Sequence, residues 1–214
     1  MMVHAPIIMI RKNLINGNLI GLKKSEKSGK ILFNEYMSSF RPETEQCPNC
    51  MAKGNCIVFA YYHRYLIDFL NGRPDVARIR VLRVVCTNCG ATHAILFDPI
   101  IPYEQHSLFF ILNVLAVFHL HIKSIVKICS DYEISVSTFY RWKKLFQSHR
   151  KEWKGATNAI EATIIDSILE LFRKDPFADF AREFFSRTGM SFMQSHKNPS
   201  RCQRRLKSDD SEFP

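Results

Sequence analysis

Two pairs of cysteines, each with the spacing Cys-x-x-Cys, constrain this chain more than any other feature. Cys47 pairs with Cys50 and Cys86 pairs with Cys89, and positions 51 to 85 lie between the two pairs. A Cys-x-x-Cys turn directs two thiolates at one point, so two such turns together supply the four sulfur ligands of a tetrahedral metal site. We therefore predict one structural Zn²⁺ ion with these ligands: Cys47, Cys50, Cys86 and Cys89.

The residues beside the cysteines favour tight turns. Gly90 follows the second pair, where a turn needs a residue that tolerates positive φ, and Pro48 fixes φ inside the first pair. A disulfide framework fits poorly because the chain has seven cysteines, an odd number, and its N-terminus lacks the pattern of a secretory signal. Iron held by the same four cysteines, in a small electron carrier, stays open as an alternative.

The segment between the cysteine pairs predicts an antiparallel hairpin. Residues 57–67 are rich in β-forming side chains, residues 71–74 read as a turn, and residues 77–85 alternate arginines with apolar residues. Such a hairpin returns Cys86 to the side of Cys50. We expect residues 47–98 to form a zinc ribbon, an antiparallel hairpin with two cysteine knuckles.

The rest of the chain predicts an α+β protein with a helical second domain. Residues 1–46 are expected to form an arm with a short helix at 33–40, residues 103–185 a helical domain, and residues 186–214 a basic tail that is disordered alone. The predicted helices are 105–118, 122–130, 136–150, 158–172 and 177–185.

The charge pattern favours a polyanionic partner. Lys and Arg total 30 against 20 for Asp and Glu, a net charge of +10. The excess is concentrated in residues 119–154 and again from residue 182 onward, which favours nucleic acid over a membrane. The longest apolar stretch, residues 108–120, is too short to span a bilayer. Thiolates that hold a metal fit a reducing compartment, so we expect a cytoplasmic protein.

Residues 122–148 carry the pattern of a helix-turn-helix. We expect the first helix to bury Ile122, Ile125, Val126 and Cys129. Ser135 is expected to be the N-cap of the second helix. Ile134 and Phe139 occupy the two positions of a hydrophobic staple, which fixes the angle at which the second helix leaves the turn.

The second helix has an apolar face made of Phe139, Trp142 and Phe146, and its polar side chains lie elsewhere. A recognition helix places such polar residues in the major groove of double-stranded DNA, and a basic tail adds phosphate contacts. The candidate DNA-binding residues are Ser135, Ser137, Thr138, Arg141, Lys143, Lys144, Arg201, Arg204 and Arg205. An ordinary amphipathic helix pair with a solvated basic face is the alternative.

An ordered set of motifs resembles a known family. It comprises the two cysteine pairs, residues 90–94, 101–103, 107–108 and 135–142, and the ending at 192–202. Over residues 33–205 these resemble an uncharacterised family of zinc-ribbon plus helix-turn-helix proteins of Gram-positive bacteria, similar to the DNA-binding N-terminal regions of mobile-element transposases. The resemblance implies DNA association rather than a reaction. We expect a nucleoid-associated regulator or accessory factor of a mobile element, which forms a homodimer or binds a mobile-element protein.

We expect no enzymatic activity. The carboxylates after residue 98 lie on no convincing strand, as the metal site of a transposase would require. Cys56, His63 and His93 lie near the cysteine pairs in sequence, but four cysteines already complete a tetrahedron, so we expect structural roles for them. A zinc-ribbon adaptor that binds a protein partner is the other non-enzymatic alternative.

Overall fold

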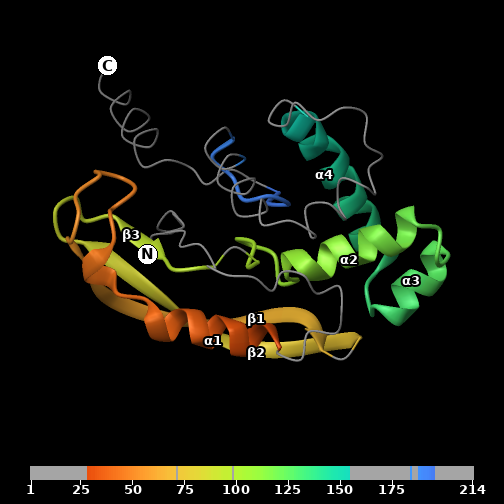
Figure 1. The fold of residues 1–214 in the computed structure, drawn as a ribbon, viewed down its shortest axis with the longest axis horizontal. Coiled ribbons are helices and arrows are strands. Elements are labelled where there is room, and N and C mark those ends of the chain that lie inside the picture. The colour runs from red at the N-terminus through yellow and green to blue at the C-terminus, as the bar shows by residue number, and fades with distance from the viewer. Residues whose placement is uncertain (1–27, 71, 98, 155–183, 185–187, 196–214) are drawn as a thin grey trace, which may run out of the picture.

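The computed structural model has a mixed α/β fold, and it describes residues 28–70, 72–97, 99–154, 184 and 188–195. Side chains are described as far as residue 149 in the last helix. The elements, shown in Figure 1, are α1 (Gly29–Ser39), a short 3₁₀ turn η1 (Pro42–Thr44), β1 (Cys56–Leu70), β2 (Arg73–Cys86), β3 (Thr92–Ala94), α2 (Leu108–His119), α3 (Ile125–Asp131) and α4 (Val136–Lys154).

A long antiparallel hairpin dominates the N-terminal half. Its register places Cys56 opposite Cys86 at one end and Leu70 opposite Arg73 at the other, with an irregularity between Val58 and Ala60. The strand β3 adds to the other side of β2, so the sheet order is β1-β2-β3 and β1 is an edge strand. The sequence anticipated a hairpin between the cysteine pairs, but with shorter strands and without β3.

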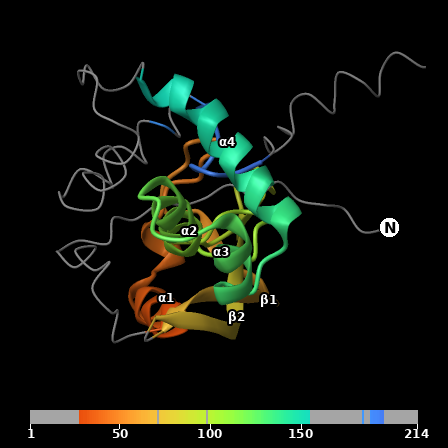
Figure 2. The same ribbon diagram turned by 90° about the vertical axis from the view of Figure 1, so that its right-hand side faces the viewer.

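The first helix covers one face of this hairpin (Figure 2). Ser28 caps α1, since its hydroxyl accepts a hydrogen bond from the Ile31 amide. Phe33 and Tyr36 are buried and pack against Phe97 at ring-centroid distances of 6.0 and 5.8 Å. The short helix expected at 33–40 thus begins earlier, at Gly29, and its aromatic side chains join the core of the hairpin.

The helices α2, α3 and α4 surround a second core. Phe139, Trp142 and Phe146 of α4 are all at most 2% exposed and pack with the apolar residues of α2. Because these three side chains lie on one face at helical spacing, the amphipathic pattern of α4 is that of a helix packed along one side.

The expected buried face of the first helix in this pair was correct only in part. Cys129 is buried and Ile125 is half-buried against the helical core, but Ile122 and Val126 are 60% and 76% exposed. Ile128, which was not in the expected set, is buried. The helix starts later than expected because Ser124 is its N-cap, accepting from the Lys127 amide at 3.3 Å. The residues before Ile125 therefore lie outside the helix, and the buried stripe shifts toward its C-terminus.

The tip of the hairpin joins the two cores. Phe69 stacks on Phe110 of α2 at a centroid distance of 4.5 Å. The backbone of Ile67 accepts from Ser107 at 2.8 Å and donates to Gln105 at 2.9 Å. Since β1 thereby contacts both cores, the hairpin fixes α2 relative to the cysteine end of the molecule.

Several predicted segments fall outside the described residues. The predicted helix 158–172 does, and so do most of the predicted helix 177–185, most of the tail 186–214, and Arg201, Arg204 and Arg205. Within the part of the chain that the structure describes, no helix is both long and apolar enough to cross a membrane.

Candidate metal centre and helix pair

The two cysteine turns have the same backbone geometry. In the first, the Met51 amide donates to the Cys47 carbonyl at 2.8 Å; in the second, the Gly90 amide donates to the Cys86 carbonyl at 2.8 Å. Met51 and Gly90 both have positive φ, at 61° and 67°. The fifth position of each turn therefore requires a left-handed backbone, which glycine supplies in only one of them.

The turns bring four sulfur atoms together. The Sγ atoms of Cys47 and Cys89 are 3.7 Å apart, as are those of Cys50 and Cys86, and all four lie within 4.8 Å of one another. These separations are far longer than a disulfide bond of about 2.05 Å. Four sulfurs at about 2.3 Å from one Zn²⁺ ion form a tetrahedron with edges of about 3.8 Å. The four cysteines can hold a metal ion.

Each turn also stabilises the sulfur of the other. The side-chain amide of Asn49 donates to Cys89 Sγ at 3.4 Å, and that of Asn88 donates to Cys50 Sγ at 3.4 Å. The two asparagines occupy the same position in the two Cys-x-Asn-Cys motifs. This repeat in the sequence indicates equivalent roles for them, but the sequence prediction did not include the two hydrogen bonds. Hydrogen bonds of this kind orient metal ligands and tune their basicity.

A buried histidine contacts the same cluster. His93 in β3 is 0% exposed, and its Nε2 lies 3.3 Å from Cys47 Sγ. Burial lowers the pKa of His93, which favours a neutral ring. The tautomer with the proton on Nε2 donates to the sulfur and leaves Nδ1 as a buried acceptor, with no hydrogen-bond partner among the described residues.

The thiols differ in their acidity. Burial raises the pKa of Cys47 to about 12, whereas the hydrogen bond from Asn88 is the main cause that lowers the pKa of Cys50 to about 6. Four adjacent thiolates repel one another, so a bound cation is needed to keep all of them deprotonated.

Cys56 and His63, which also lie near the cysteine pairs in sequence, are not in the sulfur cluster. Cys56 is 1% exposed and lies opposite Cys86 in the sheet, and its sulfur is outside the cluster of four. Burial raises its pKa, which makes it an inert thiol. His63 lies farther along β1 with an exposed side chain.

The start of α4 is capped as expected. The Ser135 hydroxyl accepts from the Thr138 amide at 3.1 Å and lies within hydrogen-bond distance of the hydroxyls of Ser137 and Thr138. Ile134 and Phe139, on either side of this cap, are both buried. The preceding residue Glu133 has a φ of 53°, so the turn between α3 and α4 contains a left-handed residue.

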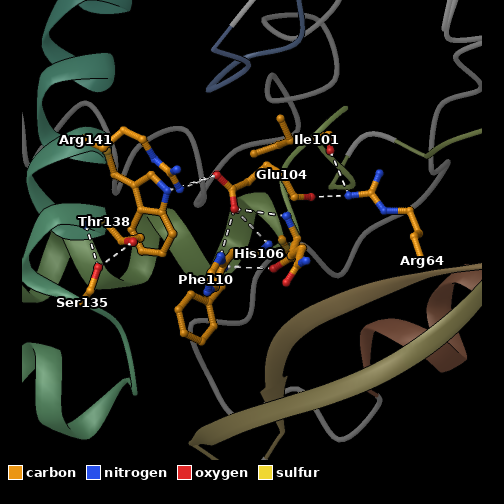
Figure 3. Close-up of polar contacts among 11 residues, drawn as sticks. Arg64, Ile101, Glu104, His106, Phe110, Ser135, Thr138 and Arg141 are labelled. Atoms are coloured by element: carbon orange, nitrogen blue, oxygen red, sulfur yellow. Dashed lines mark hydrogen bonds and ion pairs between the residues drawn. The ribbon is translucent and has the colours of Figure 1, made fainter. Parts of the chain in front are cut away.

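Glu104 connects the start of α2 to α4 (Figure 3). Its Oε2 accepts from Arg141 at 3.1 Å and from the Trp142 indole at 3.3 Å, and its Oε1 accepts from His106 at 2.9 Å. Arg64 of β1 donates to the Glu104 carbonyl. Burial opposes ionisation of Glu104, yet the bond from His106 and the charge of Arg141 hold its pKa below the ordinary value. Sequence reasoning missed this residue, because no local pattern pairs it with α4.

The predicted DNA-binding residues of α4 do not share one surface. Ser137, Arg141 and Lys144 are exposed along one side of the helix. Lys143 is half-buried, with its Nζ 4.7 Å from the centre of the Phe118 ring. Thr138 is half-buried beside the cap. The exposed stripe therefore contains three of the five predicted residues within α4.

The fold and the cysteine cluster define a mixed α/β protein with a site competent to bind a metal ion. Residues 47–142 match a family model described as a domain of unknown function (DUF6431). The match includes both cysteine turns, the whole sheet and α4 as far as Trp142. No curated protein and no solved structure gave a match to the chain.

Proposed function

We propose that this chain is a zinc-binding, duplex-DNA-binding protein without catalytic activity of its own. In this proposal, Zn²⁺ bound by the four cysteines holds the ends of the β1–β2 hairpin together as a zinc ribbon. The sulfur separations of 3.7 Å support a single tetrahedral ion. A polynuclear iron–sulfur cluster would place its own iron and sulfide atoms between the cysteines and would hold their sulfurs farther apart.

The helices α3 and α4 would act as a helix-turn-helix, with α4 in the major groove. The short turn with left-handed Glu133, the Ser135 cap and the buried pair Ile134 and Phe139 are the features such a motif requires. Packing of α2 against both helices supports the same arrangement.

The observation that carries the proposal is the exposed stripe of α4. It consists of Ser137, Tyr140, Arg141, Lys144, Gln147 and Ser148. This stripe combines hydrogen-bonding groups with cations, and no carboxylate occurs between positions 134 and 151. In a recognition helix, polar side chains near the N-terminus contact base edges, and cations along the exposed side reach phosphates.

Loss of Lys144 tests this proposal. Lys144→Ala should weaken duplex binding and make the slope of log affinity against log salt shallower by about 0.9, the value for one phosphate contact. Lys53→Ala removes the same charge from an exposed position before the hairpin and is the matched control. Equal binding by both variants, with unchanged helicity, would contradict a recognition role for α4.

The visible absorption of the purified protein tests which metal is bound. A purified protein with one equivalent of Zn²⁺ is colourless, whereas iron in a four-sulfur site absorbs visible light. Iron as the bound metal would favour the alternative of a small electron carrier.

A role in a mobile element, as a regulator or an accessory factor, rests on the family resemblance. The basic tail with Arg201, Arg204 and Arg205 would add contacts to phosphates. A chain that ends at Ser195 keeps the buried Phe192 and Met193 and loses the three arginines. It should then bind all duplex sequences more weakly and to a similar degree.

An adaptor that binds a protein partner is the second candidate, and one observation favours it. Ile122 lies before α3 and Val126 lies within it. Both are exposed apolar side chains, and they are close together in sequence. If this pair binds a partner, Val126→Asp should abolish that complex and leave duplex binding unchanged.

A further inference from the structure

The β1–β2 hairpin has two faces of opposite character. Leu66 and Ile79 on one face are buried beneath α1 and its neighbours. The side chains that alternate with them point to the other face, because successive residues of a strand alternate in direction. We call the following exposed set the open hairpin face: Tyr61, His63, Tyr65, Arg78 and Arg80.

The strand register makes this face one continuous surface. Tyr65 lies opposite Arg78, and His63 lies opposite Arg80. The Arg80 guanidinium carbon lies 3.8 Å from the centre of the Tyr61 ring. The three rings of β1 occupy alternate positions, about 6.7 Å apart along the strand. This repeat is similar to the distance between neighbouring nucleotides of an extended, unstacked strand. Tyr61 and Tyr65 are two repeats apart, so they match every second nucleotide of such a strand.

The charge of the open hairpin face is of one sign. In β1 and β2, the carboxylates belong to Asp68 and Asp75, which lie opposite each other and alternate away from this face. Asp68 accepts a hydrogen bond from Ser107, the N-cap of α2, at 2.8 Å. Two arginines therefore lie among the exposed rings with no carboxylate of the hairpin beside them.

The tyrosine rings are exposed to solvent, although the Arg80 guanidinium covers one face of the Tyr61 ring. Tyr61 and Tyr65 are 48% and 55% exposed, which is high for aromatic side chains within a sheet. An apolar protein partner would have to desolvate Arg78 and Arg80 without a countercharge. A single nucleic-acid strand supplies both flat bases for the rings and phosphates for the guanidinium groups.

We propose that the open hairpin face binds single-stranded nucleic acid. Unpaired bases stack on Tyr61 and Tyr65, and Arg78 and Arg80 contact the phosphates. Bases in a duplex are stacked on one another and cannot present their faces to these rings, so this surface is selective for single strands. It lies on the hairpin rather than on α4 and does not depend on the proposed duplex binding.

Fluorescence anisotropy on the zinc-loaded full chain tests the proposal. The probes are a labelled oligothymidine and an abasic oligomer of the same length and charge. The wild type should bind the oligothymidine more tightly than the abasic strand. Tyr65→Ala should weaken oligothymidine binding about 5- to 150-fold, the effect of losing one base–aromatic stack, while Tyr65→Phe should bind like the wild type.

Two control variants separate this surface from α4. Tyr140→Ala removes an aromatic ring of similar exposure from α4 and should leave oligothymidine binding unchanged. Lys144→Ala should also leave oligothymidine binding unchanged, whether or not it weakens duplex binding. Failure of the single-strand proposal can therefore be distinguished from failure of the duplex proposal. Equal affinity for the abasic strand, or normal binding by Tyr65→Ala, would overturn the proposal. A dimer that Tyr65→Ala dissociates would also overturn it, because the face would then join two copies of the chain.

Discussion

Asn49 donates its side-chain amide to the sulfur of Cys89, 3.4 Å away in the opposite cysteine turn. Asn88 makes the equivalent bond to Cys50. These bonds cross between the turns, so they stabilise negative charge on the sulfurs and also hold the two turns in register.

Removal of this amide should weaken metal binding without abolishing it. Asn49→Ala should raise the dissociation constant for Zn²⁺ by about 10- to 100-fold, the usual effect of losing a group that hydrogen-bonds a ligand. Competition with a chromophoric chelator measures this constant. Asn49→Asp should raise the dissociation constant for Zn²⁺ more than Asn49→Ala does, because a carboxylate beside the sulfurs adds repulsion. An alanine variant with wild-type affinity would show that the amide is only a surface contact.

Cysteine substitutions should distinguish the four metal ligands from Cys56, which is not a ligand. Cys86→Ser should lose zinc and expose residues 47–98 to protease, because the metal holds the ends of the hairpin together. Cys56→Ser is the matched control: Cys56 is equally buried, but its sulfur lies outside the cluster. Metal analysis and limited proteolysis give the two readouts. Full zinc retention by Cys86→Ser would disprove the ligand set.

Met51 is a position where substitution should stabilise the protein. Its φ of 61° is unfavourable for a residue with a Cβ, and its side chain is 62% exposed, so little packing is lost. Met51→Gly should raise the free energy of unfolding of the zinc-loaded protein by about 1 kcal/mol. Urea denaturation measures the change. Gly90→Ala, at the equivalent position of the second turn, should shift it in the opposite direction.

Glu104 should contribute stability that depends on pH. Its pKa is lower in the folded protein than in the unfolded chain. The contribution is therefore present above the unfolded pKa of about 4.3 and is lost as the pH falls through the folded value. At neutral pH, Glu104→Gln should destabilise the protein by about 1–2 kcal/mol, a modest figure because Arg141 is more than half exposed.

The difference between Glu104→Gln and the wild type should shrink on acidification. Both proteins lose metal on acidification, so this loss cancels when their free energies of unfolding are compared at the same pH. Glu43→Gln removes an exposed carboxylate from η1 and controls for net charge. A difference that stays constant from neutral pH to below pH 4 would rule out the ionised network as its source.

Truncation of two nearby residues of α4 should change the stability of the protein by very different amounts. Trp142 is 1% exposed and lies in the helical core, so Trp142→Ala should cost about 3–5 kcal/mol. Tyr140 is 51% exposed, and Tyr140→Ala should change stability by less than about 0.5 kcal/mol. Thermal unfolding followed by circular dichroism distinguishes them. Equal effects would contradict the packing of α4 described above.

Local patterns in the sequence determined the cysteine turns, the hairpin and the second helix of the pair. Two identical spacings, a turn signal at 71–74 and the cap at Ser135 each act over a few residues, so their consequences can be inferred without a partner. The buried face of α4 followed for the same reason, since periodicity alone places Phe139, Trp142 and Phe146 together.

Tertiary structure alone decided the contacts between distant segments. His93 reaches Cys47 because β3 adds to β2, and Glu104 meets Arg141 because the tip of the hairpin holds the start of α2. The exposure of Ile122 and Val126 likewise depends on where Ser124 starts α3 and on which side of it α2 packs. A sequence lists which residues can form hydrogen bonds, but packing of the two cores determines which of them meet.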